Sequence, residues 1–411
     1  MQTLMEHGCG SDVHQATVVA CVLIVRKDGK VKKQLRTFGT TTRELLNLRE
    51  WLLSEGCTHV AMESTGDYWE PVYAILEGGL EIVVATAQHV KKVPGRETDV
   101  KDTEWIADLL CQGLLRSSFA PPHPIREPRH LTRYRRKLVE SQSAERNRLL
   151  KLPGSANIKL ASVASDVFGV SGVLMLQALV KGKTTSREMA ELAKRKLRKK
   201  IPELELALEG KIEEHHRFLL ELQLDRLRAV EEDLVKIEQR IQEKLEPYAA
   251  QLVSLQEIPG VDWTLAAVII AELGVDMSVF RSVSQLAWAG ACPGNNESAG
   301  KRKSSHIPKG NVYLKTDLVE AANAAAQAKS DYLRDNFYRL KAQRGYKRAA
   351  VAIAHKILTA IYHMLTQNVP YNDLGDLYLN RLNKNHLTRN LVHRLQRLGY
   401  SVRLTLQEKP A

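Results

Sequence analysis

Four acidic residues within the first 102 positions have the types and spacing of a divalent-metal site. Asp12 lies at the start of a predicted β-hairpin, and Glu63 directly follows the mostly apolar run 59–62, where a buried strand should end. Asp99 and Asp102 stand three residues apart on one predicted helix, so they should share a face. Mg²⁺ takes carboxylate oxygens as ligands, and paired ions can stabilise both the attacking and the leaving oxygen of a phosphodiester displacement. The pattern predicts a nuclease site of the RNase H type with Mg²⁺ as cofactor.

Each of these acids, taken singly, also fits an ordinary surface or a helix cap. Asp99, near the start of its predicted helix, could simply complement the helix dipole. Glu104 and Asp108 lie on the same predicted helix and compete for the role of ligand. The spacing alone therefore leaves a metal site and a solvated acidic face both open.

A serine in a loop of small residues is a second candidate for chemistry. Ser298 lies between Gly294 and Gly300, so its hydroxyl has room to approach a phosphate. Nearby cations could stabilise the charge that develops in a transition state. They are Lys301, Arg302 and Lys303. From the residues alone Ser298 is one loop serine, Ser304 and Ser305 are equal candidates, and Tyr313 is a conceivable nucleophile.

The charge balance favours a polyanionic partner. Lys and Arg number 60 against 47 Asp and Glu, which gives a net charge of +13 and a pI near 9.4. The segment 125–151 is helix-forming and strongly basic, which suits phosphate contacts. We expect nucleic-acid contacts from Arg129, Arg133, Arg135, Arg136 and Lys137, as well as from Lys301, Arg302 and Lys303. The alternative for the helix is a solvated basic face.

The elements that must position these residues indicate several domains. In residues 12–115 a predicted hairpin (17–25 and 31–38) is followed by alternating helices and strands, which predicts an α/β domain with a mixed sheet over residues 1–120. Residues 121–250 should form a basic helix and a coiled-coil linker, residues 251–368 an all-α domain carrying Ser298, and residues 369–411 a basic, partly ordered tail.

A heptad pattern marks the second segment. Leucine and isoleucine recur every seven residues at Leu220, Leu227, Leu234 and Ile241, which is typical of a coiled coil. The partner could be another protomer or a helix of the same chain.

Cysteine usage and hydropathy point to the cytosol. The five cysteines form no Cys-x-x-Cys pair, which argues against a disulfide framework and a zinc ribbon. The N-terminus lacks the pattern of a signal peptide. The stretch 261–275, the most apolar, is too short to span a bilayer and carries Asp262 and Glu272.

Three short blocks resemble motifs of the insertion sequence 110 transposase family. They are Gly-Ser-Asp-Val-His at 10–14, Ala-Met-Glu-Ser-Thr-Gly at 61–66, and Lys-Lys-Val-Pro-Gly-Arg at 91–96 followed by Thr-Asp-Val-Lys-Asp at 98–102. The resemblance implies a RuvC-like DEDD domain with Asp12, Glu63, Asp99 and Asp102 as metal ligands. Residues 258–326 resemble the family's C-terminal transposase domain, which implies that Ser298, followed by Ala299 and Gly300, is the nucleophile.

The resemblance also implies a function and partners. It implies a DNA transposase or recombinase that cuts and rejoins DNA through a covalent serine–DNA intermediate, assisted by Mg²⁺ at the same phosphate. Members of that family act as homo-oligomers, guided by a structured bridge RNA, on the DNA of a bacterial nucleoid. Two alternatives remain from the residues: a metal-dependent junction resolvase or nuclease that hydrolyses DNA without the serine, and a non-catalytic nucleic-acid scaffold.

Overall fold

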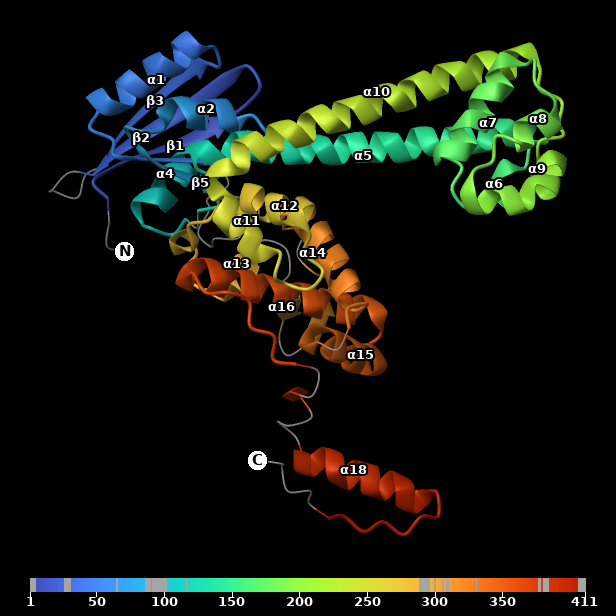
Figure 1. The fold of residues 1–411 in the computed structure, drawn as a ribbon. Coiled ribbons are helices and arrows are strands. Elements are labelled where there is room, and N and C mark those ends of the chain that lie inside the picture. Colours follow the sequence, from blue (N-terminus) through green and yellow to red (C-terminus); the bar gives the residue numbers. More distant parts are fainter. Residues whose placement is uncertain are drawn as a thin grey trace. The chain divides into compact units, whose positions relative to one another are not determined.

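The protein is described by a computed structural model that covers residues 5–25, 31–63, 66–85, 90, 102–115, 117–287, 296–298, 301–304, 307, 310–329, 331–375, 378–379 and 384–405. Its contacts divide the chain into two compact units, Met1–Ala120 and Pro121–Ala411. The first unit is built around a β-sheet, and the second is mostly helical (Figure 1).

A five-stranded mixed sheet forms the centre of the first unit. Its strands are β1 (His7–Val13), β2 (Thr17–Val25), β3 (Val31–Gly39), β4 (His59–Glu63) and β5 (Glu81–Ala85). They are ordered β3-β2-β1-β4-β5, with β2 antiparallel to both neighbours and β1, β4 and β5 parallel. The predicted α/β unit with a mixed sheet is therefore confirmed.

Helices cover both faces of this sheet. On one face, α1 (Thr42–Ser54) and α2 (Trp69–Leu76) pack over strand residues that include Cys9, Val18 and Met62. On the other face lies α4 (Asp102–Cys111), which contacts β1, β2 and β4. The helix predicted for residues 43–55 buries Leu45, Leu48 and Leu52, as its 3.6-residue pattern requires.

The first strand, β1, is the element that the sequence does not reveal, because glycine replaces the usual β-forming residues. A Cβ on Gly10 would lie 2.3 Å from the backbone oxygen of Thr103 and 2.4 Å from the backbone nitrogen of Ala107. Helix α4 thus rests directly on the β1 backbone, and only glycine permits so close an approach. Gly8 similarly faces Leu110 and Cys111 farther along the helix.

Replacing Gly10 with Ala is expected to lower the free energy of unfolding by about 3 kcal/mol, because the added methyl meets backbone rather than a movable side chain. Urea denaturation of the intact protein measures this loss. Gly8→Ala is the matched control, since its nearest obstacle is the Cys111 side chain, at 2.8 Å, and a side chain can turn away. Equal losses in the two variants would show that α4 does not rest on Gly10.

A long helical hairpin dominates the second unit. Helix α5 (His123–Ser155) and helix α10 (Glu214–Leu245) lie side by side and antiparallel, because Arg146 pairs with Glu231 whereas Arg135 pairs with Glu238 (Figure 1). The heptad residues of α10 are buried between these two helices, except Leu220, which packs into the tip at their far end. The apolar seam is thus covered by a helix of the same chain.

A small helical tip joins the far ends of α5 and α10. It contains α6 (Leu160–Val163), α7 (Val170–Lys181), α8 (Ser186–Ala190), the 3-10 helix η1 (Arg195–Lys200) and α9 (Ile201–Ala207). Its core includes Met175, Leu176 and Leu204, together with Leu220 of α10. The tip is therefore a packed subdomain rather than a plain turn.

A compact helical bundle follows the hairpin. Its helices are η2 (Glu246–Tyr248), α11 (Ala249–Leu255), α12 (Trp263–Leu273), η3 (Met277–Val279), α13 (Val283–Ala287), α14 (Val312–Ala325), α15 (Tyr332–Arg344) and α16 (Tyr346–Gln367). The bundle also contains a short β-hairpin of β6 (Asn296–Ser298) and β7 (Lys301–Ser304), so the expectation of an all-α domain is wrong. Residues 384–397, expected to lie in a partly ordered tail, form α18 (Lys384–Arg397).

Helix α16 is long and apolar enough to cross a membrane by length and composition alone. Its apolar face, with Ile353, Ile357 and Ile361 buried, packs against α14 and α15, which is the environment of a core helix. This is weak support for a membrane segment.

The cysteines of the first unit are buried free thiols. Cys9, Cys21, Cys57 and Cys111 form no disulfide among the described residues. Burial raises the pKa of Cys57 to about 12 and that of Cys111 to about 11. Cys57 and Cys111 are therefore protonated packing residues, and Cys292 lies outside the described part of the chain.

Candidate active site

Asp12 and Glu63 lie on neighbouring parallel strands at the same end of the sheet. The last paired residues of β1 and β4 are Ser11 and Met62, and each acid follows immediately. Side chains that are in register on adjacent strands point to the same face, about 4.8 Å apart along the hydrogen-bonding direction. The two predicted ligands are thus neighbours.

Asp102 lies at the same end of the sheet, on helix α4, which covers one face of the sheet. Asp12 shares its face with Gly10 and Gly8, the glycines on which α4 rests. Because Thr103 lies over Gly10 and Cys111 over Gly8, the helix runs antiparallel to β1 and begins near Asp12. Asp102 is the first residue of that helix, so three of the four predicted acids come from three elements that meet at one edge. Asp99 lies outside the described residues.

The Asp12 carboxylate has a histidine partner. Its Oδ2 lies 3.2 Å from Nε2 of His14, in the turn between β1 and β2, and its side chain is 30% exposed. The carboxylate is thus held at the edge of the sheet yet open to solvent on one side. Such an acid can exchange a protein contact for a cation.

The two competing acids of α4 are engaged in side-chain contacts. Glu104 accepts a hydrogen bond from Nζ of Lys33 at 3.0 Å, and this contact raises the pKa of the lysine. Asp108 accepts a bond from the Gln112 amide at 2.8 Å, one helical turn on. Position favours Asp102 as the member of α4 that belongs with Asp12 and Glu63, because it precedes Thr103, which lies over Gly10 of β1.

Ser298 ends a strand rather than standing in an open loop. It is the last residue of β6, and it pairs with Lys301 of β7, while Glu297 pairs with Arg302. The backbone pairing therefore brings the predicted nucleophile next to the predicted cations of β7. The side chains of this hairpin lie outside the described part of the structure.

The arginines of α5 make ion pairs inside the second unit. Arg135 donates to Glu238 of α10 at 2.6 Å, and Arg136 donates to Asp317 of α14 at 3.3 Å. Lys137 pairs with Glu140 on the exposed face of its own helix. These contacts assign the basic helix a structural role that the sequence interpretation did not foresee.

A fully buried carboxylate lies at the centre of this network. Glu272 of α12 accepts bonds from Nε and Nη2 of Arg133 at 2.7 and 2.9 Å, and Nε of Arg129 lies 3.0 Å away. Asn311 donates a further bond at 2.6 Å, while its own Oδ1 caps the first turn of α14. Glu272 thereby joins α5, α12 and the start of α14, the helix that follows the Ser298 hairpin.

Sequence reasoning missed Glu272 as a key residue, although a signal was present. It stands alone in the apolar helix α12, and a carboxylate in such a helix must be paired when it is buried. Its partners could not be read from the sequence, because Arg133 lies 139 residues away.

A groove of about 810 Å³ lies between α5, α12 and α14. Tyr313 forms part of its wall, with the guanidinium of Arg133 4.6 Å from the ring centre and that of Arg136 at 5.6 Å. The ring is thus stacked against cations. Asp317 faces the same groove, and burial raises its pKa to about 6 although Arg136 opposes the shift.

The free energy of unfolding of the Asp317→Asn variant, relative to that of the native protein, is expected to rise as the pH increases from 4.5 to 7.5. The folded protein holds the Asp317 proton up to about pH 6, whereas an unfolded Asp releases it near 3.8, so the native protein loses stability across this window. The asparagine variant lacks that loss, and the difference in unfolding free energy should change by about 2 kcal/mol. Urea titrations at pH 4.5 and 7.5 measure it, and a constant difference would contradict the raised pKa.

The turn at 258–261, which precedes α12, lies packed against α14. Gly260 has φ of +88°, and a Cβ there would lie 2.3 Å from the backbone oxygen of Ala321 in α14. Asp262 caps α12 by accepting a bond from the Leu265 backbone at 2.8 Å. The turn thus fits a close helix-to-helix contact within the bundle.

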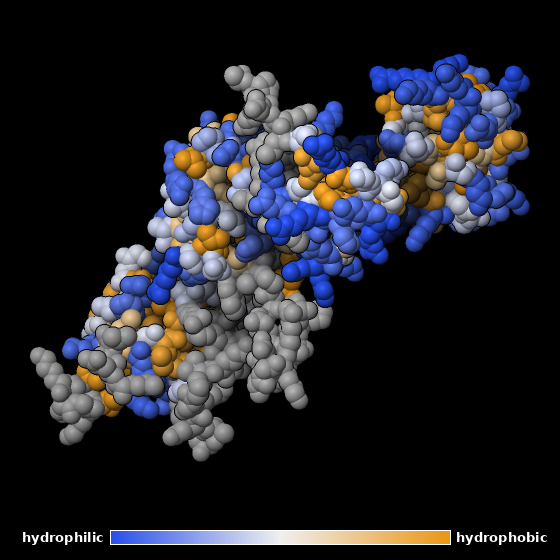
Figure 2. Space-filling view, turned by 90° about the horizontal axis from the view of Figure 1, so that it is seen from below, coloured by the Kyte–Doolittle hydropathy of each residue, from blue (hydrophilic) through white to orange (hydrophobic). Residues whose placement is uncertain are grey.

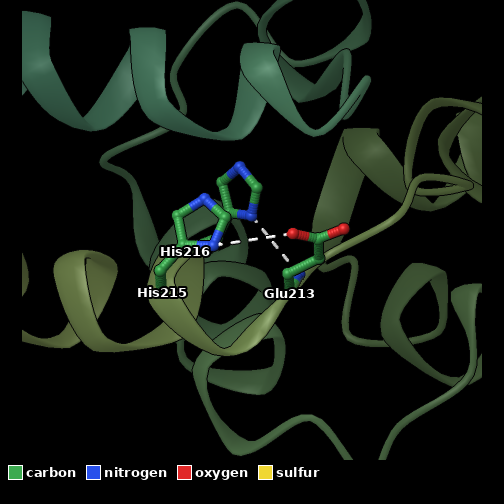
Figure 3. A group of neighbouring side chains, drawn as sticks. All are labelled: Glu213, His215 and His216. Carbon is green, nitrogen blue, oxygen red and sulfur yellow. Dashed lines mark hydrogen bonds and ion pairs between the residues drawn. The ribbon is translucent and has the colours of Figure 1, made fainter.

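Another group with metal-binding atoms lies in the second unit. Glu213, His215 and His216 bring one possible ligand atom each within 4.8 Å of one another at the start of α10 (Figure 3). Here, however, Nδ1 of His216 accepts a bond from the Glu213 backbone and the Glu213 side chain caps the helix, which together form a capping box. The group is thus accounted for as a helix cap.

Comparisons with known proteins match two separate parts of the chain. Residues 9–152 match the transposase family of DEDD type from IS110, and residues 253–339 match the family described as transposase IS116/IS110/IS902. The transposase for insertion sequence element IS1111A of Coxiella burnetii (strain RSA 493 / Nine Mile phase I) is 33% identical over 121 residues, which cover 28% of this chain and 33% of that protein. The first match contains Asp12, Glu63 and Asp102, and the second contains Ser298. The chain belongs to the IS110 family of transposases.

Proposed function

We propose that this protein is a DNA transposase that cuts and rejoins DNA at the ends of an insertion sequence. The observation that carries the proposal is the meeting of Asp12, Glu63 and Asp102 at one edge of the sheet, in a chain of the IS110 family. The mixed sheet with Asp12 and Glu63 on adjoining parallel strands supports a RuvC-like fold for the first unit. Asp99 is proposed as the fourth acid of the set.

These acids have the chemistry that a divalent cation requires. Asp12, Glu63 and Asp102 offer carboxylate oxygens without competing thiols, and oxygen ligands are those preferred by Mg²⁺. The partial exposure of Asp12 leaves room for a cation and a phosphate beside it. Divalent ions bound there would stabilise the charge that develops on the reacting phosphate oxygens.

Ser298 is proposed as the nucleophile. Its hydroxyl oxygen would form a bond to the phosphorus while the bond from phosphorus to the leaving deoxyribose oxygen breaks, and the leaving oxygen takes up a proton. The number of phosphate ester bonds is unchanged, so the strand can be rejoined without an outside energy source. Lys301, Arg302 and Lys303 on β7 would attract and neutralise the phosphate.

A covalent adduct is the expected product of the first step. Incubation with DNA carrying the element's ends, Mg²⁺ and RNA transcribed from the flanking DNA should give a protein–DNA band on a denaturing gel. Ser298→Ala should abolish that band, whereas the matched Ser304→Ala variant, in the same hairpin, should keep it.

The alternative is a metal-dependent resolvase or nuclease that hydrolyses DNA. It predicts free DNA ends, no adduct, and cleavage that is indifferent to Ser298→Ala, so the same gel separates the two functions. A non-catalytic scaffold predicts no cleavage with any divalent ion. The acids on three converging elements favour an enzyme over a scaffold.

A structured bridge RNA, a homo-oligomeric state and action in the bacterial cytoplasm, at the nucleoid, are further parts of the proposal. They rest on the family resemblance and on the net charge of +13. Among the residues of α5 that were predicted to contact nucleic acid, Lys137 is paired only on an exposed face, and its side chain is 60% exposed, so it is the one of that set best placed to exchange an acid for a phosphate. The heptad seam is covered by α5, so an oligomer would use other surfaces.

A further inference from the structure

The tip of the helical hairpin carries an excess of cations that the proposed active site does not use. The sequence between residues 181 and 200 contains nine lysines and arginines and two acids, Glu188 and Glu191. Every cation in the run 194–200 is exposed. Figure 2 shows strongly hydrophilic side chains along one edge of the tip, which lies at the right-hand end of that view. The tip thus presents a concentrated positive surface.

The short helix η1 holds this surface in a defined shape. Leu197 packs against the core of the tip, which anchors the helix. Because a 3-10 helix has three residues per turn, Lys196 and Lys199 lie on one face and Arg195 and Arg198 on the next. The cations are therefore arrayed on an anchored element rather than on a free loop.

Some of these cations make hydrogen bonds or ion pairs within the tip. Arg198 donates to Glu191 at 3.3 Å, and Nζ of Lys200 donates to the backbone oxygen of Val163 at 3.3 Å. In the part of the chain that the structure covers, Arg195, Lys196 and Lys199 have no side-chain ion pair or hydrogen bond. These three cations are open to an outside anion.

Arg195 also has a strained backbone, with φ of +53°. The other described non-glycine residues with positive φ are Asn157 and Asn368, and asparagine tolerates this conformation far better than arginine. Glycine at position 195 would relieve the strain. The strain that arginine causes at this position, where glycine would cause none, points to a use for its side chain outside the fold.

We propose that η1 and its surroundings form a second nucleic-acid contact, which binds the phosphodiester backbone through Arg195, Lys196 and Lys199. The inference rests on the proposed function, because a transposase must hold DNA and RNA beyond the cleaved phosphate. Arg133 and Ser155 are separated by 22 helical residues of α5, or about 33 Å. The tip would therefore hold a duplex about one helical turn from the bundle, at a repeat of about 34 Å.

The chemistry of this surface favours nucleic acid over a lipid membrane. Membrane-binding segments place apolar and aromatic side chains among their cations. The only apolar residue in 194–200 is Leu197, and it packs inward. Backbone contacts without base recognition need only cations spaced along a rigid element, as here.

The test is the salt dependence of binding by the full chain. Labelled 30-base-pair DNA and an RNA hairpin of matched length are titrated with protein between 50 and 200 mM KCl. Each lost phosphate contact lowers the slope of log Kd against log salt by about 0.9. Arg195→Ala/Lys196→Ala/Lys199→Ala should therefore lower the slope by about 2 to 3 for DNA, for RNA or for both, and the affected ligand identifies the source of the phosphates.

The matched control removes three exposed cations of α10 that are paired with acids, Arg228, Lys236 and Arg240, and it should change the slope by less than one. An unchanged slope in the tip variant, or an equal fall in the control, would overturn the proposal. So would loss of binding to phosphatidylglycerol vesicles with both slopes unchanged. The covalent adduct at Ser298, tested at low salt, should persist in the tip variant, which separates this proposal from that of the active site.

Arg195→Gly distinguishes a binding role from a structural one. The variant should melt at the same or a higher temperature, because glycine relieves the positive φ, while its salt slope falls by about one. A lower melting temperature together with an unchanged slope would show that Arg195 serves the fold, and would remove it from the proposed contact.

Discussion

Glu63→Gln is expected to lower DNA strand cleavage at least about a thousandfold, measured in single-turnover reactions at saturating Mg²⁺. Glutamine keeps the shape of the side chain but removes the negative charge that a cation requires. The position lies at the end of β4, where a half-exposed side chain contributes little to the core. Circular dichroism and the melting temperature should therefore be nearly unchanged.

Glu81→Gln is the matched control for this prediction. Glu81 begins β5, the strand next to β4, and its exposed carboxylate pairs with His59, at the opposite end of the sheet from Glu63. The control should cleave like the native protein. Cleavage by Glu63→Gln within tenfold of the native rate would exclude Glu63 as a ligand.

Glu272→Ala is expected to have the largest effect on stability, a loss of about 3 to 5 kcal/mol in the free energy of unfolding. The substitution leaves the guanidinium groups of Arg129 and Arg133 without the buried carboxylate that neutralises them. It also removes the acceptor for Asn311, which caps α14. Guanidinium chloride denaturation, followed by tryptophan fluorescence, measures the loss.

Glu238→Ala provides the comparison for Glu272. Glu238 also pairs with an arginine of α5, Arg135, but its side chain is 43% exposed. Solvent screens such a pair, so the loss should stay below about 1 kcal/mol. Similar losses in the two variants would mean that burial of Glu272 does not set its contribution.

The same contacts change how the α5 arginines must be tested. An alanine at Arg133 would weaken the bundle through Glu272, so reduced RNA binding by that variant would combine a fold defect with a lost phosphate contact. Lys137→Ala avoids this problem because its partner Glu140 lies on the solvent face.

Local signals in the sequence were enough for most of the first unit. The β-branched run 17–25 became β2, the leucine spacing of residues 45–52 became α1, and the apolar run before Glu63 became β4. Asp12 and Glu63 come together because β1, which the sequence did not predict, lies parallel to β4 and ends at the same edge. Hydrophobic period and element order therefore predicted the elements that carry Glu63 and Asp102, but not the strand that carries Asp12.

Long-range contacts account for what the sequence did not reveal. Strand β1 is a strand because α4 needs bare backbone at Gly10, and that requirement appears only once the helix is in place. The arginines of α5 read as a phosphate-binding face because Glu238, Glu272 and Asp317 lie more than a hundred residues away. The polar strands β6 and β7 lack the apolar alternation by which strands are recognised.

The central claim is tested most directly by locating Mn²⁺, a substitute for Mg²⁺, in crystals through its anomalous scattering. The account predicts a peak within coordination distance of the carboxylate oxygens of Asp12, Glu63 and Asp102, which Glu63→Gln removes. No peak at that edge of the sheet, or a peak at Glu213, His215 and His216 alone, would contradict it.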